Sequence, residues 1–425
     1  MKCIPNVIQK LVFTAARKYP GIKYRKRPKI KSMRERLLFL IPGVLGCLKY
    51  QLLNHVRYTL FVAVFLACFS FNQLLFSIDP ILFKKEIENC PKWMLKQIER
   101  DLNYLKEVDI SLTEINELFN QSVPEHFIVK FSIDNNVVSV EKKINHPCIE
   151  VRINSYLIFF QKLCKLAEIP NVTFFIFMHD GIVEFPELYK KLPMFVMSRS
   201  VNSRNCILIP DYEAVNERYQ VLNKKDITRY VCPWAFKKNK LIWRGSIDQD
   251  ALDYSTNIMT ASNTHLFSRV KLCELSLEFP DVLDAKFTLF KNEDRSVPYL
   301  KNFRGDWIDY EEIFSYKYQM QIHGNVSAFS CSGWRFFSNS LVFIPESRWI
   351  QWYSGNLIPY VHYIPVKSNL DDLIEKLLWA QKYDEQARQI ATNAREFALE
   401  HLTFTAHFVY FYFLFEKYSQ LSFSL

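Results

Sequence analysis

The chain has 425 residues, 49% of them hydrophobic, so it can bury a large core and is expected to fold as two domains. Its formal net charge of +10 arises at the N-terminus, because residues 1–57 hold fourteen of the 54 Lys and Arg but only one of the 44 acids, Glu35. The remainder is therefore nearly neutral, with 40 basic and 43 acidic residues. This distribution excludes a nucleic-acid enzyme, whose basic surface would lie on the fold itself.

The N-terminal region is expected to meet a membrane. The basic residues 1–57 suit anionic lipid headgroups, although a solvated basic tail would have the same composition. Residues 58–78 follow as an uncharged apolar helix, long enough either to cross a bilayer or to lie in its interface. A buried helix pair packed on the body of the protein is the alternative.

The cysteines bear on which side of the membrane the body occupies. Seven follow residue 80 at irregular spacing, without a Cys-x-x-Cys pair, which is typical of a reducing compartment. The glycosylation sequon at Asn325 lies in a loop predicted below to bind phosphate, where a glycan would block the site. We therefore expect a membrane-associated protein whose body faces the cytoplasm.

The first domain is expected over 91–232. Ser111 and Glu114 predict a capping box, and the residues around Asp134 to Asn136 predict a hairpin. The apolar run 172–178 predicts a buried strand, and His179-Asp180-Gly181 follows it. A carboxylate just past a parallel strand lies where α/β sheets bind ligands, so Asp180 is a candidate general base. A plain Asp-Gly turn is the alternative.

The second domain is expected over 233–381 and carries a first candidate phosphate site. The strand 241–243 leads into Arg244-Gly245-Ser246, which offers a planar cation, a closely approaching backbone and a hydroxyl. The alternative is an Arg in a surface turn. Asp248 and Asp250 could hold a divalent ion, but acids here also suit the start of a helix, which we favour, so no metal is predicted.

A second candidate phosphate site lies within 316–367. The order is strand, glycine-bearing loop, helix start and strand, an arrangement that points backbone N–H groups at an anion. Its candidate ligand-binding residues are Gly324, Asn325, Arg335 and, past the next strand, Glu346. Beyond it, Ser368 with Asp371 predicts the start of one long helix that reaches Phe397.

The residue identities in 316–367 are more specific than the order of its predicted elements. Lys-Tyr, Gly-Asn, Trp-Arg-x-x-Ser-Asn-Ser-Leu-Val-Phe and Val-His-Tyr-Ile-Pro-Val-Lys together resemble glycosyltransferase family 90. The resemblance runs from about Pro91 to the C-terminus. It implies a GT-B fold, with two Rossmann-like α/β domains facing a cleft and C-terminal helices, residues 382–425, that pack back on the first domain.

The resemblance also assigns roles to residues. Phe-Ile-Phe-Met-His-Asp is similar to the segment that carries the family's catalytic aspartate, which makes Asp180 the base, with His179 beside it. Ser198 and Arg199 match a following segment and are expected to line the cleft. Trp-Arg-Gly-Ser matches the donor-phosphate segment, but Ile247 stands where many relatives carry a further Arg, so one contact is missing or comes from elsewhere.

The function expected from the resemblance is inverting, metal-independent transfer of a sugar from a nucleotide donor, UDP, to a hydroxyl of a lipopolysaccharide core or other glycan. No cofactor is expected beyond the nucleotide sugar, and nucleic acid is not an expected partner. Three alternatives stay open: a protein O-glycosyltransferase, a metal-dependent transferase using Asp248 and Asp250, and a non-catalytic membrane-bound sugar-binding protein.

Overall fold

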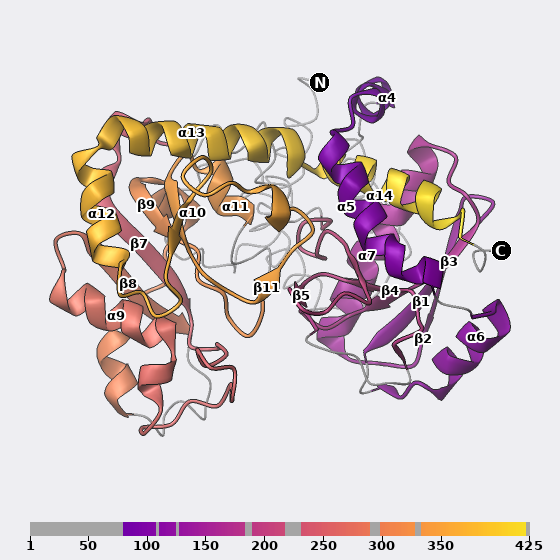
Figure 1. Cartoon of the computed structure of the whole chain (residues 1–425), viewed down its shortest axis with the longest axis horizontal. Coiled ribbons are helices and arrows are strands. Elements are labelled where there is room, and N and C mark those ends of the chain that lie inside the picture. The colour runs from indigo at the N-terminus through magenta and orange to yellow at the C-terminus, as the bar shows by residue number, and fades with distance from the viewer. Residues whose placement is uncertain are drawn as a thin grey trace, which may run out of the picture. The chain divides into compact units, whose positions relative to one another are not determined.

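The computed structural model describes residues 80–107, 110–124, 127–182, 189–216, 231–289, 298–327 and 333–421. The predictions for 1–57 and 58–78 lie outside these residues. Within the described part of the chain, no helix is both long and apolar enough to cross a membrane. The described residues form a mixed α/β structure with two five-stranded sheets, each containing parallel strands (Figure 1).

Helices open the described chain. The predicted capping box is confirmed, because the Ser111 hydroxyl accepts from the backbone N–H of Glu114 and the Glu114 carboxylate accepts from the backbone N–H of Ser111. The elements are α4 (Pro80–Glu88), α5 (Lys92–Leu102), the 3-10 helix η1 (Asn103–Glu107) and α6 (Leu112–Gln121).

The first sheet has the strand order β2-β1-β3-β4-β6. Its strands are β1 (Ile128–Asp134), β2 (Val137–Lys142), β3 (Val172–Phe177), β4 (Met194–Val196) and β6 (Ile207–Leu208). The predicted hairpin is confirmed as β1 and β2, and Asn135 and Asn136 both have positive φ in its turn, as the favoured two-residue hairpin turns require. β3, β4 and β6 are parallel, and α7 (Pro147–Leu166) precedes β3.

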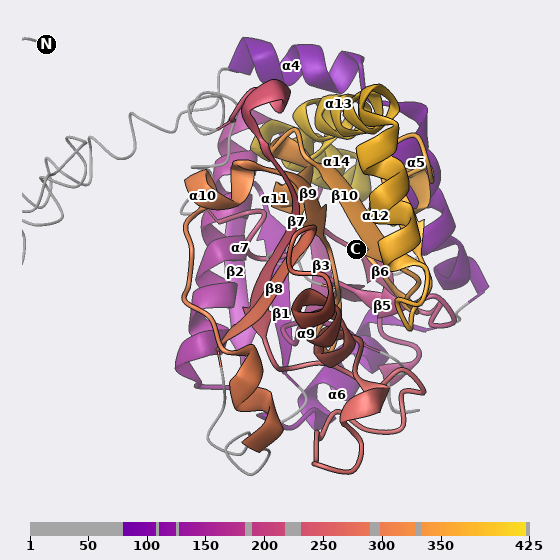
Figure 2. The ribbon, with the colours of Figure 1, turned by 90° about the vertical axis from the view of Figure 1, so that its left-hand side faces the viewer.

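The second sheet is entirely parallel, with the order β12-β10-β9-β7-β8. Its strands are β7 (Lys238–Ser246), β8 (Leu283–Leu289), β9 (Tyr316–Met320), β10 (Leu341–Pro345) and β12 (Ile364–Val366). Figure 2 shows β7, β8 and β9 side by side. The helix α9 (Ser268–Glu278) precedes β8 in the chain. The first strand of this sheet in the chain, β7, has β8 on one side and β9, β10 and β12 in succession on the other. The strand order therefore reverses between β7 and β9.

Further helices complete the second half. They are α10 (Tyr310–Phe314), α11 (Gly333–Phe337), α12 (Leu373–Lys382), α13 (Asp384–His401) and the 3-10 helices η5 (Trp234–Phe236), η6 (Thr264–Leu266), η8 (Pro298–Phe303) and η10 (Ser354–Asn356). The prediction of one helix from Ser368 to Phe397 is wrong. The chain leaves helical geometry at Tyr383, with φ −106° and ψ 54°, which ends α12 before α13 begins.

A small two-stranded ladder links segments that are far apart in the sequence. β5 (Arg199–Ser200) follows β4, and it pairs antiparallel with β11 (Trp349–Ile350), which follows β10. The backbone N–H of Val201 also donates to the Arg348 carbonyl over 2.7 Å. The residues after the first sheet's β4 and those after the second sheet's β10 are therefore in direct contact.

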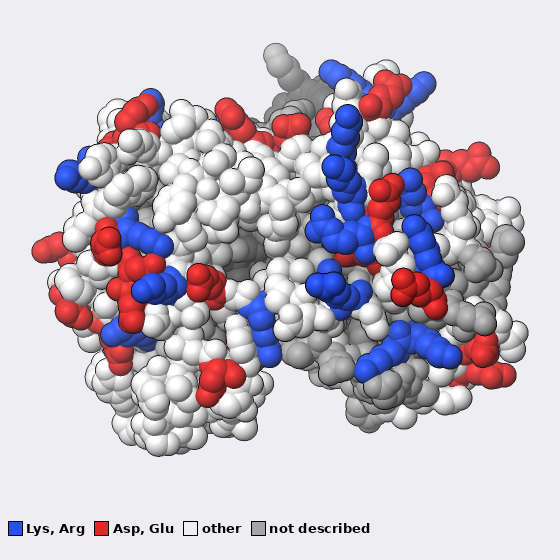
Figure 3. Space-filling model, in the orientation of Figure 1, with Lys and Arg blue, Asp and Glu red and all other residues white. Residues whose placement is uncertain are grey.

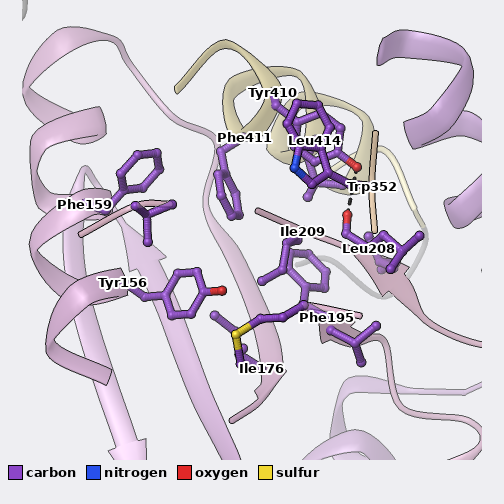
Figure 4. Close-up of a cluster of buried hydrophobic side chains, with 14 of the residues drawn as sticks. Tyr156, Phe159, Ile176, Phe195, Leu208, Ile209, Trp352, Tyr410, Phe411 and Leu414 are labelled. Carbon is purple, nitrogen blue, oxygen red and sulfur yellow. Dashed lines mark hydrogen bonds between the residues drawn. The ribbon is translucent and has the colours of Figure 1, made fainter. Parts of the chain in front are cut away.

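The last helix, α14 (Phe404–Tyr418), belongs to the core of the first sheet. The Phe408 ring stacks on Phe159 of α7 with centroids 4.0 Å apart. The Tyr410 hydroxyl donates to the Leu208 carbonyl over 2.8 Å (Figure 4). The Tyr418 hydroxyl donates to the Thr173 carbonyl on β3 over 2.9 Å. Apolar residues surround this helix on most sides, which explains its nearly continuous aromatic sequence.

Candidate active site

The candidate site begins where the second sheet reverses its strand order. In open parallel sheets, ligands bind beyond the carboxyl ends of the strands at this switch point, because the loops there diverge and leave a crevice. Here the switch point lies between β7, which ends at Ser246, and β9, which ends at Met320. Both segments that the sequence predicts to bind phosphate, 244–246 and 324–325, therefore leave the same edge of the sheet.

Arg269, in the first turn of α9, fastens these two loops together and was missed in the sequence. Its Nη1 donates to the carbonyls of Ser246, the last residue of β7, over 2.7 Å and of Asp248, just beyond it, over 2.8 Å. Its Nη2 and Nε each donate over 3.1 Å to the carbonyls of Ile322 and His323, after β9. Arg269 is only 4% exposed. A run of Phe-Ser-Arg ahead of an apolar helix gave no signal of this role.

Gly324 lies against the same guanidinium. A Cβ placed on Gly324 would come within 3.0 Å of the Asp248 carbonyl oxygen and 3.2 Å of the Arg269 Nη2, which is closer than side chains normally approach. A glycine is therefore needed for the loop after β9 to approach the loop after β7. The next residue, Asn325, buries its side-chain Oδ1 with no hydrogen-bond partner among the described residues.

Arg244 and Gly245 have local partners in the structure. The Arg244 guanidinium pairs with the Asp284 carboxylate at 2.8 Å and donates to the Asp284 carbonyl at 3.0 Å, so it is tied to β8. A Cβ on Gly245 would meet the Trp243 ring at 2.5 Å, so the packing of that tryptophan requires the glycine. Ser246 contributes both its carbonyl and its hydroxyl to Arg269, the hydroxyl at 3.3 Å.

His323 is a half-buried, neutral histidine in the loop after β9. Burial, with smaller contributions from the nearby guanidinium groups of Arg269 and Arg348, lowers the pKa of its imidazole to about 4. The side chain is therefore uncharged at neutral pH, and the positive charge at this edge of the sheet comes from the arginines.

Asp180 follows β3 of the first sheet, as predicted. Its carboxylate is 44% exposed and contacts the Arg152 Nη2 of α7 at 2.5 Å. Arg152 is fixed in turn by a 2.6 Å hydrogen bond to the Met178 carbonyl and by the Tyr212 ring, 4.8 Å from its guanidinium carbon. The neighbouring His179 packs between aromatic rings, with centroids 5.6 Å from Phe127 and 5.9 Å from Phe177.

The loop after β3 lies against the loop after β9. A Cβ on Gly181 would come within 3.0 Å of both the Val326 Cγ1 and the Ser198 carbonyl oxygen. Asp180 and Asn325 are the immediate neighbours of the two residues in this contact, Gly181 and Val326. The structure thus brings the predicted base to the loop that Arg269 holds.

Ser198 and Arg199, predicted to line the cleft, are both buried. The Ser198 hydroxyl donates to the Ile350 carbonyl over 3.1 Å, next to the β5–β11 ladder. Arg199 pairs with the buried Asp101 of α5 at 3.2 Å. Burial raises the pKa of Asp101, while the Arg199 charge opposes that rise. The contacts of both residues hold the first sheet to its neighbours.

Arg335 and Glu346 lie on either side of β10. Arg335 is buried in α11, with its guanidinium carbon 4.3 Å from the centre of the Trp334 ring. Glu346 is exposed, and its backbone N–H donates to the Val366 carbonyl over 2.8 Å, extending the ladder between β10 and β12.

The Asp-x-Asp segment is committed to protein contacts. The Asp250 carboxylate accepts from the Arg348 Nη2 over 3.1 Å and from the Trp349 Nε1 over 3.3 Å. Burial raises its pKa, and the Arg348 contacts oppose that rise. Asp248 gives its backbone carbonyl to Arg269. Among the described residues, no group of three His, Cys, Asp or Glu is placed to hold a metal ion.

Comparison with known families defines the class of this protein. Residues 85–424 match the model for Glycosyl transferase family 90, which covers most of the chain. The chain belongs to this family, so the predicted membership is confirmed.

Individual relatives are distant in sequence. Protein O-glucosyltransferase 2 of Danio rerio is 27% identical over 351 residues, which cover 81% of this chain and 65% of that protein. Protein O-glucosyltransferase 3 of Homo sapiens is 24% identical over 358 residues, covering 80% of this chain and 64% of that protein. O-glucosyltransferase LpsA of Dichelobacter nodosus is 25% identical over 209 residues, covering 48% and 55%. The chain spans less than two thirds of each of these proteins.

Proposed function

We propose that this protein is an inverting, metal-independent O-glycosyltransferase of GT-B type that uses a UDP-sugar. The donor diphosphate would bind at the switch point of the second sheet, and the acceptor hydroxyl would approach Asp180 from the first. One observation carries the proposal: Gly181, next to Asp180, is close-packed against Val326 of the loop that Arg269 holds. A proton acceptor and a phosphate-binding edge are thereby neighbours.

The chemistry follows from this placement. The acceptor oxygen attacks the anomeric carbon as the bond from that carbon to the diphosphate oxygen breaks, and UDP leaves with the bonding electrons. Asp180 takes the proton of the hydroxyl, because a carboxylate at hydrogen-bond distance can accept it as the new bond forms. Its contact with Arg152 fixes the orientation of the carboxylate.

The departing diphosphate gathers negative charge and needs fixed positive groups. Arg269, Arg244 and the backbone N–H groups of the loop after β9 supply them in this proposal. Because these groups are already held by protein contacts, they need little rearrangement during the reaction. Asp250 is paired with Arg348, which favours metal-independent transfer over an ion held by Asp248 and Asp250.

The names of the relatives direct the choice of substrate. Protein O-glucosyltransferase 2 and LpsA are both named as O-glucosyltransferases, so UDP-glucose is the first donor to test. We propose a lipopolysaccharide core or related glycolipid as the acceptor, in line with LpsA. A protein hydroxyl is the second candidate, favoured by the longer match to protein O-glucosyltransferase 2. Transfer of labelled glucose to lipooligosaccharide or to a folded protein domain distinguishes them.

We further propose that the protein works at a membrane with its body on the cytoplasmic side. Support comes from a row of basic side chains on α5, Lys92, Lys96 and Arg100, which are exposed at four-residue intervals (Figure 3). Such a row can meet anionic headgroups. Flotation with vesicles containing anionic lipid should recover the protein at low salt, and recovery with neutral vesicles alone would contradict this role.

Asp180→Asn tests the catalytic proposal. We expect the variant to lose sugar transfer by at least a hundredfold, because an amide cannot accept the proton, while UDP binding measured by calorimetry stays within about twofold. Asp134→Asn, at the exposed end of β1 in the same sheet, is the control and should retain full activity. Normal turnover by the Asp180 variant would remove this residue as the base.

A further inference from the structure

The loop between β11 and β12 exposes a group of apolar side chains. We call residues 354–363 the apolar loop. Within it Ile358 and Tyr360 are each 52% exposed, and Val361 is 37% exposed. Large apolar residues that lie singly on a surface are ordinary, but neighbouring ones form a patch of the kind that marks an interaction site. This surface therefore calls for a partner.

Hydrogen bonds hold the apolar loop in its shape. The backbone N–H of Ile358 donates to the His362 Nδ1 over 2.9 Å, and the backbone N–H of His362 donates to the Ile358 carbonyl over 2.9 Å. The Asn393 side chain of α13 donates to the Val361 carbonyl over 3.1 Å. Tyr360 has a φ of 60°, a left-handed backbone that is costly for a bulky residue and persists only where its surroundings hold it. The loop thus keeps its apolar side chains on the outside.

The basic row of α5 lies beside the apolar loop. At one end of the row, the Arg100 Nη1 is 3.7 Å from the position of a Cβ built on Gly355. At the other end, the Trp93 ring of α5 stacks on Phe397 with centroids 5.9 Å apart, and Phe397 lies 5.3 Å from the His362 ring. On the face shown in Figure 3, a column of Lys and Arg side chains over α5 borders an area without charged side chains.

The charge of this row is not offset within α5. The two acids of that helix pair with cations from other elements, Glu99 with Lys417 at 3.1 Å and the buried Asp101 with Arg199 at 3.2 Å. An apolar patch next to exposed cations is the composition of surfaces that bind anionic lipid, because the apolar side chains enter the lipid boundary while the cations meet the phosphates.

We infer that the apolar loop inserts into the boundary between headgroups and acyl chains of a membrane that contains anionic lipid, while the basic row of α5 contacts the phosphates. The inference rests on the membrane role proposed above and specifies the surface that meets the lipid. Ile358 and Val361 leave water for acyl chains, and Tyr360 places its ring at the headgroup level, where amphipathic aromatic rings are favoured. An apolar protein surface would offer the cations no opposite charge, so lipid fits both features better.

The order of the chain agrees with this orientation. The uncharged, apolar residues 58–78 come just before α4 in the sequence. Phe83 of α4 packs against Phe408 of α14 with ring centroids 6.3 Å apart, and α5 begins at Lys92, shortly after α4 ends. An apolar segment held at a membrane would therefore join the body of the protein near the basic row.

Photocrosslinking tests the insertion. Full-length protein with p-benzoylphenylalanine in place of Ile358 is irradiated with vesicles of phosphatidylcholine and phosphatidylglycerol. We expect covalent lipid adducts, because the side chain lies among acyl chains. The same photoreactive residue in place of Ile258, which is 69% exposed in the segment after β7, is the matched control and should give at least tenfold less lipid adduct. Adducts to a second copy of the chain instead of lipid would overturn the inference.

The double variant Ile358→Asp with Val361→Asp tests the same surface without a probe. Recovery with these vesicles in flotation should fall at least threefold, because acids replace the apolar side chains beside anionic lipid. Ile258→Asp should float like the wild type. Both proteins should keep the wild-type melting temperature and full sugar transfer to a water-soluble acceptor, since the substituted side chains are exposed.

Flotation of the wild type separates this inference from the membrane role itself. Wild-type protein that floats, with equal recovery of the double variant and no lipid adduct at position 358, would leave the membrane role intact and refute this surface. Wild-type protein that stays behind when anionic vesicles float would refute both. Lipid adducts at 358 but not at 258 would support the inference whichever sugar the protein transfers.

Discussion

At the residue scale, the contact between Arg152 and Asp180 makes a specific kinetic prediction. Arg152→Met removes the group that orients the carboxylate but leaves the donor loops untouched. We expect kcat to fall about tenfold to a hundredfold, with the KM for the UDP-sugar nearly unchanged, because misplacing a base affects the transition state more than the bound substrate. Steady-state kinetics at saturating acceptor measure this split.

Lys142→Met provides the comparison for that variant. Lys142, at the end of β2, pairs with Glu150 of α7, which lies within one turn of Arg152, so its loss removes a cation that contacts the same helix. Its activity should match wild type. A rise in the KM for the UDP-sugar in Arg152→Met, with kcat intact, would place Arg152 in donor binding instead.

Single residues also show where prediction from sequence succeeds and fails. Asp180 was found because its signal is local: an apolar run of strand length ends in a carboxylate. Arg269 could not be found, because its acceptors belong to two other strands and meet it only through the sheet order. The pairing of Arg244 with Asp284 likewise depends on the register between β7 and β8, in which Asp284 lies opposite Ile242.

At the scale of elements, Trp352 ties several helices to the loop after β11. Its ring lies 5.6 Å from Trp93 of α5 and 4.5 Å from Tyr410 of α14, centroid to centroid. The side chain is only 2% exposed. Trp352→Ala should therefore reduce the free energy of unfolding by about 3–5 kcal/mol, as for other large aromatic residues removed from a core.

Urea denaturation followed by circular dichroism measures this loss. Trp307, whose side chain is 74% exposed, is the matched control, and Trp307→Ala should change stability by less than about 0.5 kcal/mol. Equal losses in both variants would mean that the Trp352 cluster does not join the elements around it.

The elements themselves were predicted unevenly from the sequence. The hairpin of β1 and β2, the capping box of α6 and the strand β3 follow from short-range patterns and were confirmed. The break at Tyr383 was missed because apolar residues keep helical spacing on both sides of it. α12 contacts β12, whereas α13 contacts α11 and β10, and these different neighbours are not visible in a periodic pattern.

At the scale of the whole molecule, two histidines, one half-buried and one buried, predict how stability responds to acid. Burial lowers the pKa of His323 to about 4 and that of His407 to about 3, against an ordinary value of 6.5. Between these values the unfolded chain binds protons that the folded chain excludes. Their contribution to stability is therefore complete above pH 6.5 and is lost as pH falls, by about 1.4 kcal/mol per pH unit for each histidine.

His407→Phe isolates one of the two. The free energy of unfolding, measured from pH 6.5 to 4.5, should fall less steeply in the variant than in the wild type. The difference in slope should be about 1.4 kcal/mol per pH unit, the contribution of one proton. His265→Phe, on an exposed 3-10 turn, should leave the slope unchanged. Parallel slopes in the wild type and His407→Phe would show that His407 is already protonated in the folded protein.

The placement of α14 has a consequence for biosynthesis. A ribosome makes the chain from the N-terminus, so β1, β3 and α7 emerge long before the aromatic helix that covers Phe159 and Phe174. Until synthesis is nearly finished, that apolar surface has no permanent cover. The nascent first sheet must therefore wait through the production of the entire second one, and chaperones have their longest opportunity to bind it during that interval.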